Sequence, residues 1–332
     1  MNRFAISVKD FVAKRNREKL LFTAGPASLL AENILGLRPC FGREDGDYDA
    51  VEASVLGALK AITGHPEIVR LQGSASLALE IAGLNFLQGK VLVVQSGFYS
   101  KRLADLVSFA QLSVGAIRQV EQCDWQKIEE VSGAYDWIVS CYAETSRGLL
   151  VSIRALEALK KNTGAKILLD ATASIGLEQG HEAADVICYS SCKGLFGLTG
   201  AGFIAYSTPP QIAVPSFYLD LATHAEKKTT GPYHAIASLL EVLPRHAEFA
   251  WAVSENKRRF MRDHVDRLRI SPDAQPQLCT WVDGRISSDN PAAVLYRPRD
   301  LPGGSIVCHL GEAHLGLKAQ GDILKGLEFL DE

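Results

Sequence analysis

The chain has 332 residues, 47% of them apolar, and a formal net charge of −3 at pH 7. This length and apolar content suffice for one large α/β domain with a smaller appended domain. Charges of both signs are interspersed, which argues against a nucleic-acid-binding surface or a polybasic membrane surface. The seven cysteines are scattered, odd in number and without CxxC or zinc-knuckle spacing.

The cysteine pattern is typical of buried free thiols in a reducing compartment. Residues 1–20 lack the apolar core of a signal peptide, and no apolar run is long enough to span a bilayer. A cytoplasmic protein is therefore expected.

Three segments of different pattern follow one another along the chain. Residues 1–19 form a short amphipathic arm. Residues 20–245 alternate apolar strand-like runs with helical periodicity, which predicts a large doubly wound α/β domain with a mainly parallel sheet. Residues 246–332 begin with a charged helix, continue with short β-type runs and end in a predicted helix over 316–330. This last segment predicts a small α+β domain.

The first candidate site follows the short strand Ile68–Leu71. The strand stops at a turn of small residues that includes Ser74, Ala75 and Ser76, and a helix begins at once. Free N–H groups and the helix dipole both favour an anion at such a turn. The alternative is a serine that only caps the helix.

Other polar residues follow the next strands of the sheet. Phe98 and Tyr99 come shortly after the apolar run 90–96, Thr145 comes after 137–143, and Asp170 directly follows 166–169. Ligands of open α/β sheets bind outside the carboxyl ends of the strands, so these side chains are expected to share one site. For Asp170 the alternative is a cap on the following turn.

Lys193 lies between an apolar strand, 185–190, and a glycine-rich loop that extends to Gly202. A charged amine in such surroundings is costly unless it is paired or neutralised. Condensation with an aldehyde as a Schiff base removes that cost. The alternative is a lysine whose amine reaches the surface.

Pyridoxal 5′-phosphate (PLP) requires what these strand ends offer. The cofactor needs a lysine for its aldehyde, a carboxylate for its pyridine nitrogen, an anion site for its phosphate and a flat side chain against its ring. Lys193, Asp170, the turn 74–76 and Tyr99 or Phe98 supply these groups in order. The sequence therefore predicts PLP as the cofactor.

Seven motifs between about Leu20 and Leu243 resemble those of class V (fold-type I) PLP-dependent aminotransferases, in the family's order and with similar spacing. They are most similar to the 2-aminoethylphosphonate:pyruvate transaminases, with alanine:glyoxylate aminotransferases more distant. The motifs are LLFTAGP, REDGDYDAVEASV, LQGSASLALE, SGFYSKR, AETSRGLL, LLDATASIG and ADVICYSSCKG.

The resemblance implies an aminotransferase that moves an amino group between a small amino donor, similar to 2-aminoethylphosphonate or an amino acid, and a 2-oxo acid. It implies a homodimer with sites at the interface. Lys193 takes the place of the Schiff-base lysine and Asp170 that of the pyridinium partner. The other cofactor-binding positions are Ser74, Ala75, Ser76, Tyr99, Thr145, Ser191 and Thr230, the last reaching the neighbouring subunit's phosphate, and the substrate-binding positions are Gly25, Arg147 and Arg297.

Three residues depart from the family's pattern. Cys192 stands where the family has a polar amide, and Arg147 where it has threonine. Ile306 stands where the family has an arginine that clamps the substrate's acid group. The replacement for that clamp is expected among Arg147, Arg297 and Arg299.

Other readings stay open beside the aminotransferase. A PLP-dependent lyase or cysteine desulfurase of the same fold would need a nucleophilic cysteine on a mobile loop, whereas Cys279 and Cys308 lie in predicted strands. A divergent homologue without transaminase activity is a further reading. No metal site is predicted, because His309, Glu312 and His314 lack the spacing of a helical zinc motif.

Overall fold

The computed structural model describes residues 6–39, 44–311 and 326–330. The helices are α1 Val8–Asn16, α2 Ala31–Leu35, α3 Gly46–Thr63, α4 Ala75–Phe86, α5 Phe98–Val114, α6 Ile153–Thr163, α7 Leu221–Ala225, α8 Tyr233–Ala237 and α9 His246–Asp263. The strands are β1 Leu20–Phe22, β2 Glu67–Gln72, β3 Gly89–Gln95, β4 Ile117–Asp124, β5 Trp137–Cys141, β6 Ala143–Glu144, β7 Leu149–Leu150, β8 Lys166–Asp170, β9 Val186–Ser190, β10 Ala201–Tyr206, β11 Cys279–Val282, β12 Arg285–Ser287, β13 Ala293–Leu295, β14 Ser305–Cys308 and β15 Glu328–Leu330.

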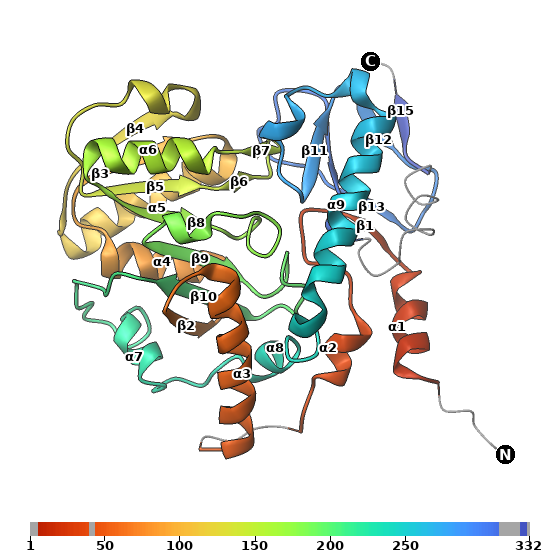
Figure 1. The fold of residues 1–332 in the computed structure, drawn as a ribbon, viewed down its shortest axis with the longest axis horizontal. Coiled ribbons are helices and arrows are strands. Elements are labelled where there is room, and N and C mark those ends of the chain that lie inside the picture. Colours follow the sequence, from red (N-terminus) through yellow and green to blue (C-terminus); the bar gives the residue numbers. More distant parts are fainter. Residues whose placement is uncertain (1–5, 40–43, 312–325, 331–332) are drawn as a thin grey trace.

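A seven-stranded sheet in the order β2-β10-β9-β8-β5-β3-β4 forms the centre of the fold (Figure 1). Strands β4, β3, β5, β8 and β9 pair in parallel, and β10 runs antiparallel to both of its neighbours, β9 and β2. The predicted mainly parallel sheet is confirmed. Because the parallel strands end at the same edge, the loops that follow them meet there.

Helices cover both faces of this sheet. Leu92 and Val94 of β3 pack into one buried cluster with side chains of α3, α6 and α8. Val91 and Val93 of the same strand pack into a second cluster with α4, α5 and α7. Successive strand residues point to opposite faces, so a strand buried on both faces must be apolar throughout. Each such side chain contributes about 1.5–3 kcal/mol on burial.

Helix α6 shows how the sequence sets the covering helices. Ser152 caps its first turn by accepting a hydrogen bond from the backbone N–H of Ala155. Leu156, Leu159 and Thr163 then face the sheet at helical spacing. The helix ends at Gly164, whose φ of 73° is a left-handed conformation that glycine adopts without strain. The cap, the apolar face and the terminal glycine all indicate the same helix limits, so α6 could be predicted from the sequence.

The C-terminal part consists of short strand pairs beside α9 (Figure 1). Strand β11 pairs with β14 and β12 with β15, both antiparallel, and β1 joins them by pairing in parallel with β13. The predicted helix over 316–330 is wrong at its end, where β15 is a strand, and residues 316–325 lie outside the described residues. The limits of the two predicted domains stay a prediction.

None of the described helices combines the length and the apolar character needed to cross a bilayer.

Glu178 links the loop after β8 to the segment that precedes β11. Its Oε1 accepts a hydrogen bond from the backbone N–H of Gln277 at 2.5 Å. Burial raises the pKa of this carboxyl to about 7. A folded-state pKa above the unfolded value means that the folded protein binds the proton more tightly, so this contribution to stability is complete below about pH 4.5 and is lost as the pH rises toward 7.

In the wild type, the titration of Glu178 lowers the free energy of unfolding between pH 5 and 7.5 by at most about 1.4 kcal/mol per pH unit. Glu178→Gln removes this titration and should make the fall with pH less steep. Urea unfolding at several pH values measures it. Glu157→Gln, at an exposed position of α6, should keep the wild-type slope. An unchanged slope in Glu178→Gln would mean that other groups cause the pH dependence.

Candidate active site

A cavity of about 610 Å³ opens at the carboxyl edge of the parallel strands. Its walls come from the turn after β2, the start of α5, and the ends of β5, β8 and β9. This is the place at which ligands bind in open α/β sheets. The cavity brings together eight of the predicted site residues, which are Gly25, Ser74, Ala75, Ser76, Tyr99, Thr145, Asp170 and Lys193.

Lys193 is a half-buried cavity residue whose stem runs along Gly25. A Cβ on Gly25 would lie 2.8 Å from Cγ of Lys193, and Gly25 has a φ of +136°. Only glycine fits both the space and the backbone conformation. The backbone N–H of Ala27 also bonds to the carbonyl of Cys192 at 2.8 Å. Within the part of the chain that the structure describes, the Lys193 amine has no hydrogen-bond or ion-pair partner.

Asp170 ends β8 and is only 7% exposed as a residue. One oxygen, Oδ1, accepts hydrogen bonds from the N–H and the hydroxyl of Thr172. The predicted turn-capping role is therefore real. The second oxygen, Oδ2, has no partner among the described residues, and Asp170 lines the cavity. A buried carboxylate that is half satisfied can accept a hydrogen bond from a ligand's N–H group.

The turn 74–76 lies at the N-terminus of α4, as predicted. Ser74 precedes the helix, and its hydroxyl makes no capping hydrogen bond. The turn is held against β10, because the N–H of Gly73 bonds to Gly200 O at 2.9 Å and a Cβ on Gly202 would lie 2.7 Å from Ser74 O. Both serines are exposed toward the cavity, so the turn offers unpaired donors to an anion.

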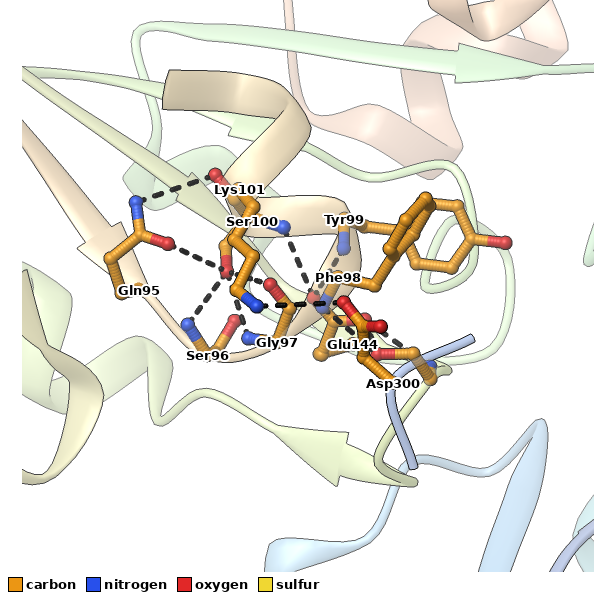
Figure 2. Close-up of polar contacts among 10 residues, drawn as sticks. Gln95, Ser96, Gly97, Phe98, Tyr99, Ser100, Lys101, Glu144 and Asp300 are labelled. Atoms are coloured by element: carbon orange, nitrogen blue, oxygen red, sulfur yellow. Dashed lines mark hydrogen bonds and ion pairs between the residues drawn. The ribbon is translucent and has the colours of Figure 1, made fainter. Parts of the chain in front are cut away.

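Tyr99, and not Phe98, lines the cavity. The two rings meet edge to face, with centroids 5.4 Å apart. The backbone N–H of Tyr99 donates to Oε2 of Glu144 at 3.0 Å, and that of Ser100 donates to the same oxygen at 3.1 Å (Figure 2). Glu144 thus fixes the first turn of α5, which carries the ring.

Glu144 is a fully buried carboxylate that sequence analysis did not single out. Its second oxygen, Oε1, accepts hydrogen bonds from the N–H and the hydroxyl of Ser146. Burial raises the pKa of Glu144, and the hydrogen bonds from Ser146, Ser100 and Tyr99 oppose the rise. A Cβ on Gly97 would lie 2.7 Å from Cγ of Glu144, so the close approach requires glycine there. The sequence signal was a glutamate directly before Thr145, at a strand end.

Tyr296, from the C-terminal part, is a second residue that sequence analysis missed. It directly follows β13, and its N–H bonds to Phe22 O at 3.2 Å. Burial raises the pKa of its hydroxyl, a hydrogen-bonding interaction with Thr145 opposes this, and one with Tyr99 adds to it. The Tyr296 hydroxyl therefore lies near Thr145 and Tyr99 of the cavity wall, which are about 150 residues or more away in sequence.

Three predicted residues lie outside the cavity. Ser191 is buried and its hydroxyl donates to Leu198 O, while its neighbours Ser190 and Cys192 line the cavity. A cofactor-binding role of Ser191 stays a prediction. Thr230 is exposed, and Arg297 is exposed beside a separate surface pocket near β12 and β13. In the single chain neither reaches the site.

Arg147 does not line the cavity either, but it lies close by in the turn between β6 and β7. It is half-buried, and its Nε is buried without a hydrogen-bond partner. The turn lies against the residue at the family's clamp position, since a Cβ on Gly148 would be 3.3 Å from Cδ1 of Ile306. Arg147 therefore belongs to a turn that packs against Ile306.

No group of three or more His, Cys, Asp or Glu suited to a metal ion occurs in the described part of the chain. His309 is buried, and its Nε2 is bonded to the Thr280 hydroxyl at 2.9 Å. Glu312 and His314 lie outside the described residues.

The fold and the cavity together define an α/β protein with the fold-type I architecture of PLP-dependent aminotransferases. Alanine–glyoxylate aminotransferase from Nostoc sp. superimposes with a TM-score of 0.76 at 17% identity, covering 92% of each chain. Pyridoxamine–pyruvate aminotransferase from Mesorhizobium loti superimposes with a TM-score of 0.72 at 17% identity, again over 92% of each chain. The predicted fold class is confirmed.

In sequence, the chain is similar to 2-aminoethylphosphonate–pyruvate transaminases. It is 29% identical to that of Pseudomonas aeruginosa over 256 residues, which cover 70% of this chain and 69% of the relative. It is 28% identical to that of Rhizobium meliloti over 257 residues, 69% of this chain and 66% of the relative. No family model matches the chain. The resemblance indicated by the motifs is confirmed.

Glu144→Ala should lower the free energy of unfolding by at least about 3 kcal/mol, because it leaves two N–H donors at the start of α5 and two donors of Ser146 without an acceptor, each worth about 1–3 kcal/mol. Glu144→Gln keeps one acceptor oxygen and should lose less. Urea unfolding measures both, with Glu129→Ala at an exposed position as the control. If Glu144→Ala stays within about 0.5 kcal/mol of wild type, Glu144 does not hold this helix.

Proposed function

We propose that this protein is a PLP-dependent aminotransferase. It would move an amino group between a small amino donor, similar to 2-aminoethylphosphonate or an amino acid, and a 2-oxo acid. The observation that carries the proposal is one cavity that holds an unpartnered lysine amine, a half-satisfied carboxylate and an exposed helix N-terminus. The transaminase relatives support it.

The residues present fit PLP. Ser74, Ala75 and Ser76 would hold its phosphate, Oδ2 of Asp170 its pyridine nitrogen and Tyr99 its ring. When bound, PLP supplies an electron sink for the transfer of the amino group. Lys193 would hold the aldehyde carbon and then, as a free amine at Nζ, move a proton to and from the substrate carbon.

The negative charge of Asp170 would keep the proton on the ring nitrogen, because an opposite charge nearby favours the charged form. The Thr172 bonds to Oδ1 orient the carboxylate for this task. Thr145, 1% exposed in the cavity wall, would contact the ring hydroxyl.

The proposal includes a homodimer. Thr230 lies outside the cavity and is exposed. A residue that reaches the phosphate site of a second copy would have to be exposed in this way. We further infer a cytoplasmic location, since the six described cysteines are free thiols.

Arg147 would bind the substrate's acid group in place of the arginine that Ile306 replaces. A buried guanidinium N–H without a partner is costly unless a ligand satisfies it. Nε of Arg147 is such a group, and the planar fork of arginine suits a carboxylate or phosphonate.

The desulfurase alternative is not favoured. Cys279 and Cys308 face each other in the paired strands β11 and β14, and both are fully buried. Burial raises the pKa of the Cys308 thiol well above its usual range, with the neighbouring Cys279 adding to the rise. A thiol of this kind is neither mobile nor a thiolate nucleophile.

Lys193→Ala should lose covalent attachment of PLP and turnover, because no other amine lines the cavity wall among the residues that the structure describes. Borohydride reduction followed by mass spectrometry of the peptides measures attachment, and transfer from 2-aminoethylphosphonate to pyruvate, or from alanine to a 2-oxo acid other than pyruvate, measures turnover. Lys161→Ala, an exposed position of α6, is the matched control. Transamination by Lys193→Ala at the wild-type rate would refute the proposal.

Arg147→Lys keeps the charge but loses the planar fork, so it should raise KM for the acidic substrate about tenfold or more with little change in cofactor affinity. Arg297→Lys, outside the cavity, should leave KM unchanged. If Arg147→Ala keeps the wild-type KM, Arg147 has no place in the substrate site.

A further inference from the structure

Arg102 is a cavity residue that none of the roles above uses. It lies on α5, one turn after the helix start that Glu144 holds, and it lines the cavity beside the turn 74–76. Its Nη2 donates to the Ser76 hydroxyl at 2.9 Å. Its guanidinium carbon lies 5.9 Å from the centroid of the Tyr99 ring. The side chain thus spans from the ring-stacking residue to the N-terminus of α4.

The charges in the cavity wall single out Arg102. Among the described residues that line the cavity, only Arg102, Asp170 and Lys193 carry a formal charge at neutral pH. Asp170 repels an anion, and the Lys193 amine is assigned to the aldehyde of the cofactor. Arg102 is then the one cation of this wall that is left to face a dianionic phosphate.

Two further observations agree with this role. No carboxylate lies within ion-pair distance of Arg102 among the described residues, so its charge is available to a ligand. Cys192, which lines the same cavity, offers only a weak S–H donor. Arg102 is therefore a cation without an ion-pair partner among the described residues, in a site with few other side-chain donors for the oxygens of a phosphate group.

We propose that Arg102 binds the phosphate of PLP as a charge-assisted hydrogen-bond donor, together with Ser76 and the N-terminus of α4. This assignment rests on the proposed function and adds a binding residue to it. A guanidinium forms short, strong bonds to phosphate oxygens, and Ser76 bridges it to the helix N-terminus. The bond to Ser76 sets the position of the guanidinium before the ligand arrives.

The test compares PLP with pyridoxal, which has the same ring and aldehyde but no phosphate. Apoprotein is titrated with each compound, and the absorbance of the lysine-bound ligand gives the dissociation constant. Arg102→Met should weaken PLP binding about 10- to 100-fold, as expected for a lost charge-assisted bond, and leave pyridoxal binding within about twofold. Arg102→Lys should recover part of the loss, because it keeps the charge.

Lys101→Met is the matched control, because Lys101 occupies the preceding position, is exposed and pairs with Asp300 at 3.4 Å outside the cavity. It should keep the wild-type preference for PLP. Thermal unfolding of each apoprotein checks that the variants are folded. We expect wild-type melting temperatures, because both side chains are exposed.

The outcomes separate the assignment from the proposed function. If wild type binds neither compound, the proposed function fails and the role of Arg102 falls with it. If wild type prefers PLP and Arg102→Met keeps that preference, only the role of Arg102 is overturned. A raised KM for the amino donor with an unchanged preference for PLP would overturn it too, since Arg102 would then face the substrate.

Discussion

The buried carboxylate of Glu144 is the contact on which the rest of the site depends. Its side chain joins the start of α5, which carries Tyr99, to the turn after β6 (Figure 2). Glu144 therefore sets the position of Tyr99 and also of Thr145, the residue that follows Glu144 in sequence. Arg102 lies one turn further along the same helix. A carboxylate at a helix N-terminus is stabilised by the unpaired N–H groups and the dipole there, which explains how Glu144 is accommodated without a cation.

The cavity itself shows the opposite arrangement, in which polar groups remain without partners. The Lys193 amine, Oδ2 of Asp170 and the Ser74 hydroxyl have none among the described residues. Unsatisfied groups of this kind cost stability, and surrounding rigid elements must hold them in place. Glycine at positions 25 and 202 allows the close packing that does so. A complementary ligand that bonds to these groups would offset this cost.

The sequence was most informative where burial dictates residue type. Strands β3, β5 and β8 are buried on both faces, so they are apolar and their last residues stand out as site candidates. Strand β4 was not predicted because it is an edge strand whose residues after Ile117 are exposed or only partly buried. The role of Ser191 stays a prediction, and its neighbours Ser190 and Cys192 line the cavity. Tyr296 is brought to Tyr99 by tertiary folding alone, and no local pattern contains that information.

The surroundings of Ile306 bear on the proposed role of Arg147 in substrate binding. Ile306 packs in an apolar cluster with Cys279, Cys308 and the partly buried Tyr296, so an arginine at position 306 would need a partner that this cluster does not contain. Isoleucine fits this apolar cluster, and under the proposed function the positive charge is supplied instead from the turn of Arg147. The guanidinium of Arg147, on the short turn that includes Gly148, would approach the substrate from a different direction than an arginine at position 306 on β14. Selectivity would then follow the distance between the amino group and the acid group of the donor, because only one such distance satisfies Lys193 and Arg147 together.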